Sequence, residues 1–226
     1  MSIHLTPRLL AVAECVPMGA RVIDVGTDHA MVPVWLAQEG IAKHIWAADL
    51  REGPLRNASA LIERTNTNTR IELRLTNGLQ GFGPEDGDTI IMAGMGGETM
   101  ISILSEASKW LQQGGLLILQ PQTKQAELRR WLSENRFSIQ REMLVEDHGR
   151  IYSYMTVVPG EPATYTTAEL YTGLFTQISG DKLFCTYLDQ LLHRVSSAAP
   201  YDADAQALLY GLQVLKERTN NNDNCG

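Results

Sequence analysis

The 226-residue sequence predicts an α/β protein with a doubly wound, mostly parallel sheet, followed by a small helical unit. Two observations lead to this prediction. Short apolar runs rich in β-branched residues alternate with helical segments, which is the pattern of parallel βαβ crossovers. Near Pro159-Gly160-Glu161-Pro162 that pattern ends, and the rest of the chain shows helical periodicity without a clear strand.

The expected elements follow one another along the first unit. A helix should begin at Pro7, with Thr6 as its cap, and another at Pro54, because proline suits the first helical position. We expect strands at 21–25, 44–50, 70–75, 88–94 and 114–121, and helices at 30–38, 54–64, 98–111 and 124–136. The segment 138–158 indicates two strands around a turn near His148-Gly149. No helix separates these two strands, so they should form an antiparallel edge.

The change of pattern sets the expected domain boundaries. Residues 1–158 form the first domain, 159–219 a helical domain and 220–226 a disordered tail. Segments near 167–178, 181–198 and 203–218 carry apolar residues at three- and four-residue spacing, which predicts a helical hairpin or a small coiled-coil-like bundle.

Composition limits the classes of function. The formal charge of −7 argues against indiscriminate binding of polyanions, and residues 161–226, with four basic and eight acidic side chains, are the more acidic part. No window approaches the ~20 apolar residues of a membrane span. Cys15, Cys185 and Cys225 form no metal-binding or disulfide framework. We therefore expect a cytoplasmic protein with reduced thiols and no metal, acting as a monomer.

The loop after the first strand has an unusual composition. It reads Asp24-Val25-Gly26-Thr27-Asp28-His29, where a dinucleotide site would need the glycines of G-x-G-x-x-G. An acid and an imidazole suit a cofactor that carries positive charge better than one that carries a pyrophosphate. Asp24 or Asp28 could instead cap the following helix, and His29 could be a structural histidine.

The loops after the next strands continue the pattern. Asp49 closes the second strand, where a carboxylate can accept hydrogen bonds from both ribose hydroxyls of an adenosine, or cap the helix that follows. Asn77-Gly78 follows the third strand and could recognise an adenine edge or form a plain turn. Gly94-Met95-Gly96-Gly97 follows the fourth, where glycine lets backbone approach a ligand, although a simple helix-capping turn is the alternative. Together these loops predict a site for an adenosyl cofactor.

Several runs resemble one known family, the bacterial tRNA (adenine-22-N1)-methyltransferases. They are DVGTDHAMVP (24–33), ADLREGPL (48–55), RLTNGL (74–79), IMAGMGGETMISIL (91–104), LILQP (117–121) and LRRWL (128–132). The resemblance covers about two-thirds of the chain. It implies a Rossmann-like class I methyltransferase domain followed by a helical coiled-coil domain, S-adenosyl-L-methionine as the donor, and methylation of N1 of an adenine in the D-arm region of tRNA, at position 22.

Within this resemblance the candidate residues take roles. Asp28, His29 and Met95 are the candidates for catalysis: Asp28 or His29 would accept the proton released from the exocyclic amine, and Met95 would stack on an extruded base. The expected cofactor-binding residues are Asp24, Gly26, Asp28, His29, Asp49, Leu50, Asn77, Gly78, Ala93, Gly94 and Met95.

The residues expected to contact the tRNA match the family less well than those expected to bind the cofactor. Candidate phosphate contacts are Arg8, Arg51, Arg56, Arg74, Lys124, Arg129 and Arg130. A solvated charged face is the simpler explanation for most of them. The chain has Met31 where the family has a tyrosine that could stack on the target base, and Thr76-Asn77 where a Gly-Asp pair is expected. Two alternatives stay open: a class I methyltransferase acting on a small molecule or protein, and a cofactor-binding interaction module without catalysis.

Overall fold

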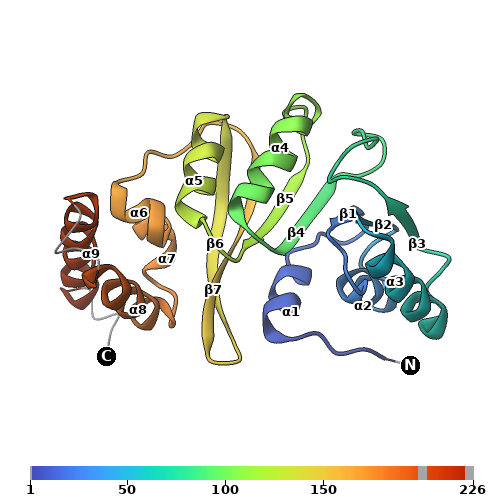
Figure 1. Cartoon of the computed structure of the whole chain (residues 1–226), viewed down its shortest axis with the longest axis horizontal. Helices are drawn as coiled ribbons and strands as arrows, with labels where there is room; N and C mark the ends of the chain where they lie inside the picture. The colour runs from blue at the N-terminus through green and yellow to red at the C-terminus, as the bar shows by residue number, and fades with distance from the viewer. Residues whose placement is uncertain (1, 198–202, 222–226) are drawn as a thin grey trace.

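The computed structural model describes residues 2–197 and 203–221 and is built on a seven-stranded sheet in the order β3-β2-β1-β4-β5-β7-β6 (Figure 1). The parallel strands are β1 (Arg21–Val25), β2 (His44–Asp49), β3 (Ile71–Leu75), β4 (Thr89–Met95) and β5 (Leu116–Pro121). Strand β7 (Arg150–Pro159) runs antiparallel to β5 and to β6 (Phe137–Asp147). The predicted doubly wound sheet with an antiparallel edge is confirmed.

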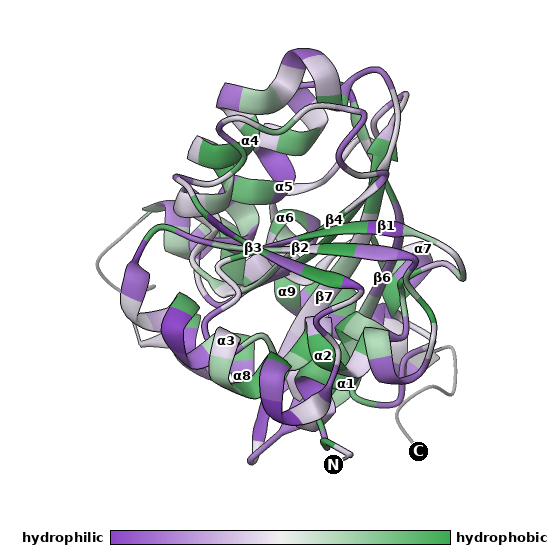
Figure 2. Cartoon of the chain, turned by 90° about the vertical axis from the view of Figure 1, so that its right-hand side faces the viewer, coloured by the Kyte–Doolittle hydropathy of each residue, from purple (hydrophilic) through white to green (hydrophobic). Residues whose placement is uncertain are grey.

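Helices cover both faces of the sheet, because its strands alternate apolar side chains between two cores. Val22 and Ile91 face α1 (Pro7–Ala13), α2 (Met31–Gln38) and α3 (Glu52–Thr65). Ile23 and Ile90 face α4 (Gly97–Leu111) and α5 (Gln125–Glu134). Figure 2 shows the sheet between these two helical layers. Burial on both faces accounts for the continuous apolar runs in the sequence.

After β7 the chain is helical. It forms α6 (Thr167–Thr172), α7 (Phe175–Ile178), α8 (Phe184–Ser196) and α9 (Ala203–Asn221), which share a third core with Leu144 of β6. The expected helical segment 167–178 is broken at Gly173, whose φ is +94°. A Cβ at Gly173 would meet the Glu142 carboxylate at 2.5 Å, so both the backbone conformation and the space beside this buried acid require glycine where the helix ends.

A buried ion pair fastens these helices to the sheet. Arg129 on α5 donates to the Glu142 carboxylate on β6 and to the backbone carbonyl of Leu170 in α6. Both charged side chains are almost inaccessible to solvent. The prediction that Arg129 contacts phosphates is therefore wrong, because its guanidinium is buried and already bound to protein groups.

Other details differ from the sequence-based expectations. Helix α3 begins at Glu52, two residues before Pro54, and the Thr6 side chain makes no capping hydrogen bond. Helix α8 begins at Phe184, later than expected, and residue 198 lies outside the described residues. Residues 220 and 221 end α9 and do not belong to a disordered tail, whereas 222–226, including Cys225, lie outside the described residues.

Two expectations based on composition concern cysteines and membranes. Cys15 is a free thiol, as expected, and the prediction for the other two cysteines depends on Cys225, which lies outside the described residues. Among the described helices, none is both long and apolar enough to cross a membrane. The same part of the chain contains no group of three or more His, Cys, Asp or Glu side chains that could hold a metal ion.

The buried ion pair predicts a large loss of stability in Arg129→Met, because Glu142 would keep its charge in the core without a partner. The free energy of unfolding in urea should fall by about 3–5 kcal/mol. The control is Arg136→Met, since the Arg136–Glu161 pair has side chains 74% and 85% exposed and should contribute less than about 1 kcal/mol. Similar small losses in both variants would contradict a structural role for Arg129.

Candidate active site at the carboxyl ends of the strands

Two buried carboxylates lie at the carboxyl ends of the neighbouring strands β1 and β2. Asp24 accepts a hydrogen bond from the Thr27 hydroxyl at 2.7 Å. Burial raises the pKa of Asp24 to about 6; the Thr27 hydrogen bond opposes this shift and the charge of Asp49 adds to it. An acid in this state is poised to pair with a cation, because a positive ligand group would offset the cost of its burial.

Asp49 organises the loops around it. Its carboxylate accepts the backbone N–H of Arg51 at 3.0 Å and that of Asp28 at 3.4 Å, so it connects the loops after β1 and β2. Its own carbonyl accepts the N–H of Thr76, which follows β3. In the described structure the Asp49 side chain therefore holds loop backbone, and it does not cap the N-terminus of α3.

The loop between β1 and α2 has an unusual backbone. Gly26, Asp28 and Ala30 all have positive φ, at +76°, +49° and +54°. Two non-glycine residues so close together in the left-handed region indicate strain stored at a functional loop. The loop exposes the side chains of Asp28 and His29, whose Oδ2 and Nε2 atoms are 3.6 Å apart. The His29 side chain is 56% exposed, so it is not a structural histidine of the core.

The loop after β4 meets the loop after β1. A Cβ at Gly26 would lie 2.9 Å from Cε of Met95, so glycine at this position leaves room for the methionine. Gly94, beside it, is exposed and has φ +81°. Gly78 plays a different part, since a Cβ there would overlap Ile103 of α4. This glycine allows close packing, while Asn77 stays exposed.

Apolar side chains also stand exposed at this edge. Leu50 and Leu75 are 64% and 55% accessible, and Leu75 is the register partner of Asp49. Large exposed aliphatic residues beside a buried acid form a surface suited to a flat aromatic ring. Leu50 was among the expected cofactor residues, but Leu75 was missed, because from the sequence it is an ordinary apolar position of a strand.

The remaining basic candidates are dispersed. Arg74 lies between the Trp46 and Phe82 rings, at 4.0 and 4.1 Å from their centroids, and pairs with Asp86. The other pairings are Arg51 with Asp49, Arg56 with Glu52, and Lys124 with Glu98 and Glu127. Arg130 is exposed, and Arg8 reaches Gln120 next to Gly94. Apart from Arg129, their contacts with RNA stay a prediction.

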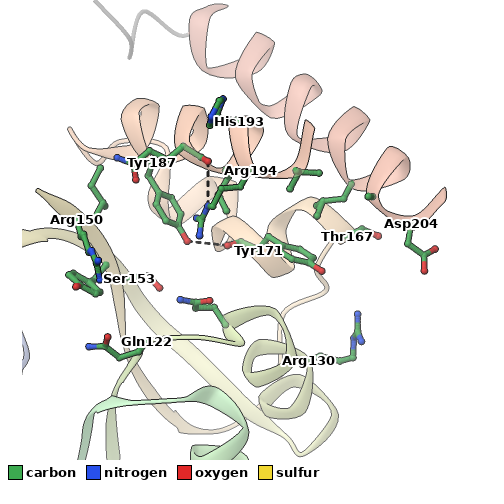
Figure 3. Close-up of a pocket in the computed structure, with 18 of the residues that line it drawn as sticks. Gln122, Arg130, Arg150, Ser153, Thr167, Tyr171, Tyr187, His193, Arg194 and Asp204 are labelled. Carbon is green, nitrogen blue, oxygen red and sulfur yellow. Dashed lines mark hydrogen bonds between the residues drawn. The ribbon is translucent and has the colours of Figure 1, made fainter. Parts of the chain in front are cut away.

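A groove of about 1250 Å³ separates the β6–β7 hairpin and α5 from α6, α8 and α9 (Figure 3). Arg130, Arg150 and Arg194 line it, and neither Arg130 nor Arg150 forms an ion pair with a described residue. Ser153 also lines the groove; it is buried, and its hydroxyl has no hydrogen-bond partner among the described residues. Asp204 is the one acidic side chain among the described lining residues, so arginines dominate the charge of this groove. Sequence reasoning identified only Arg130 in it.

Comparison with known proteins assigns a class to this arrangement. Residues 5–155 match the methyltransferase domain family, so the fold is that of a methyltransferase domain. The chain is 31% identical over 173 residues to the tRNA (adenine(22)-N(1))-methyltransferase of Bacillus subtilis strain 168, covering 76% of this chain and 73% of that protein. It belongs to that family, as the sequence motifs predicted.

Solved structures agree with this assignment. The B. subtilis M1A22 tRNA methyltransferase TrmK is 25% identical, with all of both chains covered and a TM-score of 0.81. A Streptococcus pneumoniae protein in complex with S-adenosyl-L-methionine is 29% identical, with 94% of this chain and 100% of that chain covered and a TM-score of 0.86. The similarity therefore extends through the C-terminal helices.

The raised pKa of Asp24 predicts a specific dependence of stability on pH. The folded-state pKa of about 6 exceeds the ordinary value of 3.8, so the bound proton stabilises the fold below pH 3.8 and this stabilisation is lost as the pH rises through about 6. Its full size is roughly 3 kcal/mol.

In Asp24→Asn that contribution should vanish. Urea unfolding of the wild type and the variant from pH 4 to pH 7 gives the difference between their unfolding free energies. The contributions of the other carboxylates are common to both proteins and cancel in this difference. The wild type should lose stability relative to the variant across this range. A difference that stays constant with pH would show that Asp24 titrates normally.

Proposed function

We propose that this protein transfers the methyl group of S-adenosyl-L-methionine to N1 of adenine 22 in tRNA. The observation that carries the proposal is the pair of buried carboxylates, Asp24 and Asp49, at adjoining strand ends in a chain of this family. We further propose that it acts as a cytoplasmic monomer, with residues 1–158 as the catalytic domain and 159–219 as a helical arm.

The residues at the strand ends fit the cofactor. Asp49 has a carboxylate that can accept hydrogen bonds from the ribose hydroxyls, and Asp24 offers a partner for the ammonium group. Leu50 and Leu75 offer apolar surface to the adenine ring, with Asn77 near its edge. The exposed Gly94, between the half-buried Ala93 and Met95, leaves space at the reacting end.

Methyl transfer to adenine N1 makes few chemical demands. The bound cofactor supplies an electrophilic methyl group, and N1 already carries a lone pair, so the protein must mainly orient the base and exclude water. Met95, packed against Gly26, offers apolar surface for an extruded base. Asp28 is exposed beside His29 and can accept the proton released from the exocyclic amine.

The cationic groove supports an RNA-sized substrate. It lies between the sheet and the C-terminal helices, and it brings together arginines from α5, β7 and α8. A chain with formal charge −7 needs such a local surface to hold phosphates.

The direct test of the proposed function is methylation of tRNA transcripts with labelled cofactor. An unmodified transcript with adenine at position 22 should accept about one methyl group, located at N1 by nuclease mapping, and a transcript with guanine there should accept none. The KM for tRNA should rise steeply with salt. Label at another nucleotide, or none on RNA despite cofactor binding, would contradict the proposal.

A second prediction concerns Asp28→Asn. Asparagine keeps the size of the side chain but cannot take up a proton, so the single-turnover rate should fall ~10²-fold or more. Cofactor affinity should change little, because the contact between the loops is made by the Asp28 backbone N–H. His29→Ala serves as the comparison. A normal rate in Asp28→Asn with a large loss in His29→Ala would assign the proton acceptor to His29.

A further inference from the structure

The pairing of β4 with β5 is interrupted beside the reaction site. Ala93 pairs with Gln120 and Met95 with Pro121, so Gly94 is left out of the register. Its φ of +81° favours glycine. A bulge of this kind re-aims its neighbours, which here are the exposed Gly94 backbone and the Met95 side chain facing Gly26.

A side chain replaces the hydrogen bond that the bulge removes from the ladder. Gln120, at the end of β5, is completely buried, and its Oε1 accepts the Gly94 N–H at 3.1 Å. The same oxygen accepts from Nη1 of Arg8 at 2.8 Å, while Nε2 donates to the carbonyl of Pro121. Both partners of Oε1 can only donate, which fixes the orientation of the amide.

Arg8 is in turn held by the antiparallel end of the sheet. It extends from α1, its side chain is 19% exposed, and its Nε lies 3.7 Å from Oδ2 of Asp147 on β6. Its guanidinium lies 5.6 Å from the centre of the Tyr152 ring on β7. The guanidinium is thus bound to groups of three strands, unlike a mobile surface arginine that meets a phosphate.

We propose that Arg8 and Gln120 are positioning residues that fix the Gly94 bulge and, through it, the surface against which the target base is held. The inference deepens the proposed function and rests on it for the identity of the base. Arg8 acts through Gln120 and not by contact with RNA phosphate, which replaces the role expected from the sequence. In-line transfer is sensitive to small displacements, so this role affects the rate more than binding.

The test compares Arg8→Met, Gln120→Met, the double variant and Gln120→Glu. The two single methionine variants should lower kcat for tRNA methylation about 10- to 100-fold, while KM for tRNA and Kd for the cofactor stay within about twofold. The double variant should be no slower than the slower single variant, because both break one chain of contacts. Gln120→Glu should lower kcat less than Gln120→Met, since its carboxylate still accepts from Gly94 and Arg8 although it can no longer donate to the Pro121 carbonyl.

A phosphate contact by Arg8 gives a different result. Arg8→Met would then raise KM for tRNA at unchanged kcat and weaken its salt dependence, and Gln120→Met would have no matching effect. That outcome would overturn the proposal. The control is Arg21→Met, an arginine paired with Asp88 at the opposite end of β1, which should leave kcat unchanged.

Amide hydrogen exchange tests the inference without any activity. The Gly94 N–H should exchange at least about tenfold faster in Arg8→Met and Gln120→Met than in the wild type or Arg21→Met, because its acceptor is displaced or lost. Unchanged exchange in both variants would overturn the proposal even if the RNA assay succeeds. Faster exchange in both variants, together with no methylation of tRNA by the wild type, would support the positioning contacts and contradict the proposed function.

Discussion

The rest of the site depends on one constraint: parallel strands bring the carboxyl ends of β1 and β2 together, and this chain places a buried aspartate at each. Two neighbouring buried carboxylates are costly unless donors surround them. The donors come from the loops themselves, as the Thr27 hydroxyl and the N–H groups of Asp28 and Arg51. The loops are therefore shaped by the acids they enclose.

Those donors do not satisfy the site completely, and the deficit points to a ligand. Asp24 keeps a pKa of about 6, so its charge at neutral pH is only partly compensated by the protein. A cofactor with an ammonium group would complete the compensation, and one with a pyrophosphate would add repulsion. The loop after β1 has a single glycine, whereas a pyrophosphate site would need several so that the backbone could approach the phosphates. Its composition therefore favours the same kind of cofactor.

The distribution of charge explains how an acidic chain can act on RNA. Arg129 and Glu142 cancel each other in the core, where they attach the C-terminal helices to α5 and β6. The surface arginines that remain beside them line a groove between the two parts of the chain. Net charge therefore says little about the local surface, and an acidic C-terminal segment is compatible with the proposed binding of RNA at this groove.

The strands and the acid-ended loops could be predicted from the sequence, because apolar runs and their punctuation are local signals. Arg129 could not be assigned, since LRRWL gives adjacent arginines on a helix and only the partner Glu142, 13 residues away, decides which one is buried. Gln120 was missed for a similar reason. Its contacts depend on a bulge in a neighbouring strand, and the need for glycine at position 173 likewise depends on Glu142, which is distant in the sequence.

The central claim, that the strand-end acids form the cofactor site, is tested most directly by the protons exchanged on binding. Calorimetry of S-adenosyl-L-methionine binding at pH 6, in buffers of different ionisation enthalpy, measures that number. Asp24 is about half protonated at this pH and must be ionised opposite an ammonium, so about half a proton should be released. Release should disappear in Asp24→Asn. A binding heat that is the same in every buffer would contradict the account.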